Sequence, residues 1–92
     1  MKPDYLRVQH MKGRTGRDAA NQFEIYTNNG VYFQSYSTLI AFKPFRGKIQ
    51  LDINSWDYSR TTGKYRNEFL RETKKETEGK IKSGEYELVD LN

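Results

Sequence analysis

The sequence predicts a single α+β domain, in which a four-stranded antiparallel meander packs one face against a helix and a second helix follows near the C-terminus. Three observations lead to this prediction. An Asn28-Asn29-Gly30 turn signal separates two runs rich in aromatic and β-branched residues, which is typical of a β-hairpin. Two more strand-like runs follow before residue 54. Beyond residue 60, capping residues and paired opposite charges indicate helices.

The composition limits both the core and the classes of function. Aromatic residues make up 14% of the 92 residues and hydrophobic residues of all kinds only 35%, so rings must supply much of the buried surface. There is no cysteine, which excludes disulfides and thiolate zinc sites. No apolar run is long enough to span a bilayer, and the first residues lead into no signal-peptide core. We therefore expect a cytoplasmic protein without a membrane partner.

Residues 1–21 are expected to form a basic arm, in part disordered, ahead of a domain spanning residues 22–92. The first 17 residues hold five cations and one carboxylate, in a chain whose net charge is +4. Residues 5–11 could form a short strand, and the glycines at 13 and 16 indicate a loop. Two interpretations stay open: Arg14 and Arg17 contact phosphates, or the arm is a solvated terminus.

Four strands are expected over residues 23–27, 31–36, 38–43 and 48–53. Alternation in the last of these indicates one buried and one solvated face. The first two strands carry bulk on both faces, which predicts an uncovered row of Tyr26, Tyr32 and Tyr36. Such a row could stack on nucleic-acid bases. The alternative is that tyrosine simply suits a half-wet sheet surface.

Two helices are expected after the sheet. Thr61 or Thr62 would cap a helix over about residues 62–72, and Thr73 with Glu76 forms a capping box for a second helix over 74–83. Gly84 is suited to end it. The predicted core residues are Phe23, Ile25, Val31, Phe33, Leu39, Ala41, Ile49, Leu51, Ile53, Trp56, Tyr65, Phe69 and Leu70.

The sequence offers little for catalysis. His10 is the single histidine, and the carboxylates have no spacing typical of a metal site. We expect no enzyme, no catalytic residue, no metal and no cofactor. Arg60, Lys64 and Arg66 gather around the start of the first helix, where free N–H groups favour anions. This predicts a phosphate seat with Tyr58 stacking nearby; the alternative is that the cations are only solvated.

The run from Trp56 to Leu70, with Trp-Asp-Tyr-Ser at its start and Thr-Thr-Gly-Lys-Tyr-Arg-Asn within it, resembles a small domain family of unknown function found in phage, plasmid and other mobile-element genomes. Tyr32, Phe33, Ser35 and Tyr36 also fit, and the resemblance covers roughly residues 22–92. It implies a setting, a small protein that a phage uses inside a bacterial cell. It supplies no functional residues.

Two functions follow as hypotheses. The first is nucleic-acid binding of low sequence specificity through the basic and aromatic surface residues named above. The alternative is an inhibitor of a host protein or nucleoprotein, such as an anti-CRISPR or other anti-defence factor. A homodimer through an open sheet edge is a further possibility.

Overall fold

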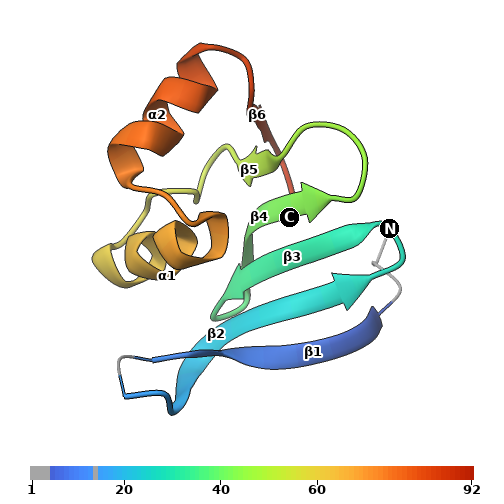
Figure 1. The fold of residues 1–92 in the computed structure, drawn as a ribbon, viewed down its shortest axis with the longest axis vertical. Coiled ribbons are helices and arrows are strands. Elements are labelled where there is room, and N and C mark those ends of the chain that lie inside the picture. Colours follow the sequence, from blue (N-terminus) through green and yellow to red (C-terminus); the bar gives the residue numbers. More distant parts are fainter. Residues whose placement is uncertain (1–4, 14) are drawn as a thin grey trace.

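The computed structural model describes residues 5–13 and 15–92, which form one sheet and two helices (Figure 1). In chain order the elements are β1 (Tyr5–Lys12), β2 (Asp18–Thr27), β3 (Gly30–Ser35), β4 (Thr38–Pro44), β5 (Gln50–Asp52), α1 (Arg60–Leu70), α2 (Lys74–Lys82) and β6 (Glu87–Val89). The strands lie side by side in the order in which they occur in the chain. The predicted α+β class is confirmed.

The prediction of a four-stranded meander was wrong, because the described residues build six strands. Tyr5–Lys12 pairs antiparallel with β2, and β2 begins at Asp18, so much of the segment assigned to the arm belongs to the sheet. β6 returns after the helices and pairs in parallel with β5. The physical reason is burial together with pairing: β1 forms a ladder with β2 and brings Met11, 7% exposed, into the core.

The predicted β2–β3 hairpin is confirmed, but its glycine has a different role from the one expected. The turn residues Asn28 and Asn29 both lack a positive φ, and the Thr27 hydroxyl closes the turn by donating to the Gly30 carbonyl at 2.9 Å and accepting from the Asn29 N–H at 3.1 Å. Gly30 has a φ of +154°, and β4 passes so close that a Cβ there would lie 2.7 Å from the Pro44 Cα. Close approach of two strands, together with this φ, therefore requires the glycine.

Both helices begin at capping residues. Ser59, and not Thr61 or Thr62, caps α1: its hydroxyl accepts from the Thr62 N–H at 3.1 Å, so α1 starts two residues earlier than predicted. The predicted capping box of α2 is confirmed, with reciprocal bonds between Thr73 and Glu76. Such local side-chain bonds satisfy the free N–H groups of a helix start.

A single core fills the space between one sheet face and the helices. Its buried members are Met11, Ala19, Phe33, Ile40, Ala41, Leu51, Tyr65, Phe69 and Tyr86. A register shift between β3 and β4 lets the neighbouring residues Ile40 and Ala41 both be fully buried. Ile53, predicted in the core, is 53% exposed because β5 ends one residue before it.

A buried carboxylate ties α2 to the chain that follows it. Glu72, whose side chain is 3% exposed, accepts hydrogen bonds from the Thr77 hydroxyl at 2.5 Å, the Lys80 ammonium at 2.7 Å and the Tyr86 hydroxyl at 2.8 Å. Burial opposes its ionisation, but these bonds outweigh burial and lower the pKa of Glu72.

Candidate nucleic-acid interface

The helices cover one face of the sheet and leave the other open. Phe33 and Ser35 on β3 mark the covered face: the Phe33 ring lies 5.7 Å from the Phe69 ring, and the Ser35 hydroxyl lies 3.0 Å from that of Thr62. Successive side chains of a strand point to opposite faces, so Tyr32 on the same strand points to the other face. In the described part of the chain, neither α1 nor α2 packs on that face.

One row of side chains crosses this open face from edge to edge. Cross-strand pairing joins, in order, Val8, Ile25, Tyr32, Phe42, Gln50 and Glu87. Residues paired directly across strands share a face, so these six side chains form what we call the open-face row. The row is apolar on β1 and β2, aromatic at its centre, and polar on β5 and β6.

The centre of the row is a stacked pair of rings. The centroids of Tyr32 and Phe42 lie 4.2 Å apart with an interplanar angle of 23°, and both side chains are half-buried. A second row beside it includes Phe23, whose ring lies 4.9 Å from that of His10. Half-buried rings on neighbouring strands are the usual platform on which bases stack in single-strand binding sheets.

Two hollows flank the stacked pair. The smaller, of about 250 Å³, is lined by Val8, Phe23, Ile25 and Gln34. The larger, of about 580 Å³, lies between the β2–β3 turn and the β4–β5 loop, and we call it the rim hollow. It combines two rings, three amides and three charged groups, namely Phe42, Phe45, Asn28, Asn29, Gln50, Arg46, Lys48 and Glu87. Rings, amides and cations together suit a base and its phosphate.

The predicted tyrosine row is not formed. Tyr26 pairs with Val31 and so shares the helix-covered face with Phe33, whereas Tyr32 shares the opposite face with Ile25. Tyr26 lies under the Arg7 guanidinium, 4.3 Å from the ring centroid. The physical reason is the two-residue hairpin loop, which places these two tyrosines on opposite sides of the sheet.

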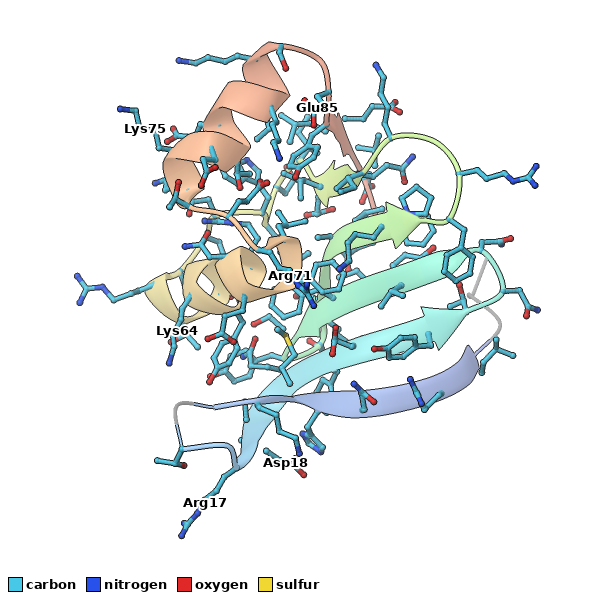
Figure 2. The ribbon with its side chains drawn as sticks, viewed as in Figure 1. Arg17, Asp18, Lys64, Arg71, Lys75 and Glu85 are labelled. Carbon is cyan, nitrogen blue, oxygen red and sulfur yellow. The ribbon has the colours of Figure 1, made fainter. Side chains whose placement is uncertain are left out.

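Other predicted residues are dispersed over the surface. Tyr36 is exposed in the β3–β4 turn with a φ of 57°, and Tyr58 is exposed ahead of α1. Arg17 projects from the β1–β2 turn, and Lys64 from the outer side of α1 (Figure 2). Arg14 lies outside the described residues. The structure thus places Tyr32 alone of the predicted aromatic site residues on the open face.

The start of α1 is not a simple phosphate seat. Arg60 and Lys64 are exposed there, but Arg66 is 1% exposed. Its guanidinium donates to the Trp56 carbonyl at 2.7 Å and to the Asp57 carboxylate at 3.0 Å. Arg66 therefore joins the corner between sheet and helix and presents no cation to a ligand.

Asp57 adds negative charge at the same place. Its other oxygen lies 2.7 Å from the Lys74 ammonium. Burial opposes its ionisation, yet the bonds from Lys74 and Arg66 prevail and lower the pKa of Asp57. Asp57 is paired with both of these cations, so it adds little repulsion of its own. The described residues that line the hollow at the start of α1 include no aromatic ring, however, so the open face is the better candidate for stacking bases.

A third concavity lies on the helix side. This groove of about 520 Å³ runs between β1, β2 and the end of α1, where Arg71 lies over the sheet (Figure 2). Arg71 and Lys43 are balanced there by Glu24 and Glu68. The mixed charge offers less to a polyanion than the rim hollow does.

The described residues bring together no group of three or more His, Cys, Asp or Glu side chains that could hold a metal ion. His10 lies on the exposed strand β1, where its Nδ1 is 3.1 Å from the Ala19 carbonyl. Within the same residues, no helix has the length and apolar character needed to cross a membrane.

Most of the open-face row was not predicted from the sequence. Phe42, Gln50 and Glu87 were not named as site residues, although the structure aligns them across β4, β5 and β6. Strand pairing was the missing signal: alternation identified the faces of single strands, but the register that joins them depends on turns and on β6.

The chain belongs to a family of unknown function, DUF8033, whose match covers residues 7–85. The matched range includes β1 from residue 7 onward, which agrees with the place of that strand within the sheet. No curated protein and no solved structure matches the chain.

Proposed function

We propose that this protein binds single-stranded nucleic acid on the open face of its sheet, without catalysing a reaction. The observation that carries the proposal is the open-face row, with the Tyr32–Phe42 stack between two hollows. Bases would stack on the rings, and the strand would run across the sheet. The face also carries Val8, which is 50% exposed, beside rings over which no helix of the described chain lies, and a contiguous apolar surface of this kind is typical of a binding site.

Charge at the rim supports an anionic ligand. Arg46 and Lys48 are exposed on the β4–β5 loop beside the rim hollow, and Arg17 lies at the β1–β2 turn. The whole chain carries a net charge of +4. These cations would contact phosphates while the open face holds the bases, which is the usual division between backbone and base contacts.

The test is fluorescence anisotropy with a labelled 12-nucleotide single strand of DNA, the same sequence as RNA, and a duplex, from about 50 to 200 mM salt. We expect salt-sensitive binding to single strands and weaker binding to duplex. Tyr32→Ala should weaken binding roughly 5- to 150-fold, since stacking contributes ~1–3 kcal/mol per base. Tyr26→Ala is the matched control, because Tyr26 is also half-buried, on the neighbouring strand, but on the covered face.

A separate pair of variants tests the phosphate contacts. Arg46→Ala should reduce the slope of log affinity against log salt by about 0.7 for a single strand. Lys75→Ala on the exposed side of α2 should leave it unchanged (Figure 2). Deletion of residues 1–17 is not a useful test, because it would remove β1 from the sheet.

Equal losses for Tyr32→Ala and Tyr26→Ala, or no binding to any oligonucleotide at low salt, would refute the proposal. In the second case the exposed apolar residues Leu6, Val8 and Phe45 would direct the search to a protein partner, such as a host nucleoprotein or anti-CRISPR target. A homodimer through β1, the edge strand, would be detected by light scattering in the same samples. The setting we propose is the cytoplasm of a bacterium that carries a phage or another mobile element.

A further inference from the structure

The last residue of the open-face row is a carboxylate, which is unexpected in a site for a polyanion. Glu87 pairs with Gln50 in the parallel register between β5 and β6, and both line the rim hollow. A carboxylate near phosphates weakens the binding of a polyanion, because like charges repel each other. It therefore favours binding only if it meets a part of the ligand that donates hydrogen bonds.

The bases differ in what they offer to a carboxylate. An ionised carboxylate accepts hydrogen bonds at two oxygens and donates none. On its pairing edge, guanine offers two adjacent donors, N1–H and N2–H. Cytosine and adenine each offer one amino group beside an acceptor, and the single N–H of thymine or uracil lies between two carbonyl oxygens. Guanine is thus the base whose exposed edge matches a carboxylate in a bidentate manner.

We propose that the rim hollow binds one guanine base of the single strand, with Glu87 accepting from its N1–H and N2–H. This inference rests on the proposed function. Phe42, which precedes Gln50 and Glu87 in the row, supplies the ring on which the guanine stacks. The Gln50 amide, between them, donates to the guanine O6. Along the pairing edge of guanine the O6 acceptor is followed by the N1–H and N2–H donors, and the row presents the Gln50 amide next to the Glu87 carboxylate in the matching order.

The neighbouring loop completes the subsite. Arg46 and Lys48 line the same hollow as Glu87, so two cations offset one carboxylate where the phosphates on either side of the guanine would lie. The volume of about 580 Å³ is within the usual range of roughly 300–1,000 Å³ for small-ligand pockets. The rest of the open face, which is apolar and aromatic, accepts any base.

The experiment compares anisotropy titrations of the full chain with a 12-mer of thymidine and with the same strand carrying one central guanosine. We expect the guanosine strand to bind roughly tenfold more tightly, in line with one bidentate base contact. A strand with deoxyinosine, which lacks the N2 amino group, should lose much of that gain. Glu87→Gln should bring the ratio of the two affinities close to one and keep binding to the thymidine strand.

The matched control is Glu78→Gln, which removes an exposed carboxylate from α2, away from the hollow. It should leave the guanosine preference unchanged. Both glutamates are exposed, so neither change removes a buried contact, and circular dichroism would verify the fold. A wild-type ratio near one, with Tyr32-dependent binding to the thymidine strand, would overturn the guanine inference and leave the proposed function standing. A preference that survives Glu87→Gln would overturn the role of Glu87, and no binding to either strand would overturn both proposals.

Discussion

Replacing Glu72 with alanine tests the packing of α2 against the chain that precedes and follows it. The carboxylate is buried and accepts three hydrogen bonds, from Thr77, Lys80 and Tyr86. These partners come from the start of α2, from its last turns and from the segment before β6. One side chain therefore fixes three parts of the C-terminal half.

The expected magnitude follows from the hydrogen bonds and the ion pair that the alanine substitution removes. A hydrogen bond to a charged group contributes about 1.5–3 kcal/mol, and the three are not additive because they share one acceptor. The Lys80 ammonium is 36% exposed, so removal of Glu72 leaves no buried charge and the full cost of breaking a buried ion pair does not apply. We expect Glu72→Ala to lower the free energy of unfolding by about 2–4 kcal/mol, and Glu72→Gln by about 1–2 kcal/mol, since the amide keeps the shape but not the charge.

Urea unfolding followed by far-ultraviolet circular dichroism measures these changes. Tyr86→Phe should cost about 1–2 kcal/mol alone, and the double variant Glu72→Ala/Tyr86→Phe should cost at least ~0.5 kcal/mol less than the two single changes together. Glu78→Ala, an exposed change on the same helix, should stay within about 0.5 kcal/mol of wild type. A loss under ~1 kcal/mol for Glu72→Ala, or strict additivity in the double variant, would refute this account of the cluster.

The pH dependence gives a second, independent readout. Because the hydrogen bonds hold the pKa of Glu72 below its ordinary value of 4.5 in the folded protein, the unfolded chain binds the proton more readily. The stabilisation is therefore fully present above pH 4.5 and is lost as the pH falls through the lowered pKa. Glu72→Gln should flatten this acid limb of the stability curve.

Three further predictions concern other contacts. Gly30→Ala should cost more than about 1 kcal/mol in urea unfolding, since a Cβ there meets β4. Gly79→Ala, at a position with open space and no positive φ, should not destabilise, and a cost under ~0.5 kcal/mol for Gly30→Ala would contradict the close approach. Burial and Glu72 raise the pKa of Tyr86 to about 12 from 10.0. Its stabilisation should hold below pH 10 and disappear toward pH 12, and an absorbance titration near 10 in the wild-type minus Tyr86→Phe difference would contradict it. Arg66→Met should cost about 2–4 kcal/mol through loss of bonds to the Trp56 carbonyl and Asp57, and an unchanged urea midpoint would contradict a structural role for Arg66.

The sequence predicted well those features that depend only on residues close together in the chain. The α2 capping box depends on Thr73 and Glu76 alone, and the β2–β3 hairpin depends on the continuous run from Gln22 to Ser35. β1 and β6 were not recognised as strands of one sheet, because each becomes a strand only by pairing with a segment whose position the local pattern does not specify. Long-range pairing overrides composition in both cases.

The faces on which Tyr26 and Tyr32 lie can be worked out from the hairpin alone. A two-residue hairpin loop pairs each even-numbered residue of the first strand with an odd-numbered residue of the second. Tyr26 must then share a face with Val31 and Phe33, and not with Tyr32. The turn signal alone carried this information. By contrast, the alignment of Phe42 with Gln50 and Glu87 needed β6 and could not be read from local pattern.

The strands lie in the sheet in the same order as they occur in the chain. This arrangement has a consequence for how the sheet assembles. Four of the five strand junctions join consecutive segments through short turns, whereas the β5–β6 junction encloses both helices, residues 53–86. Short closures cost little entropy and local contacts form early. The strands from β1 to β5 can therefore pair turn by turn, whereas β6 can pair with β5 only after the longer segment that holds both helices has closed. Until β6 pairs, the edge of β5 has free N–H and C=O groups, at which two incompletely folded chains can join.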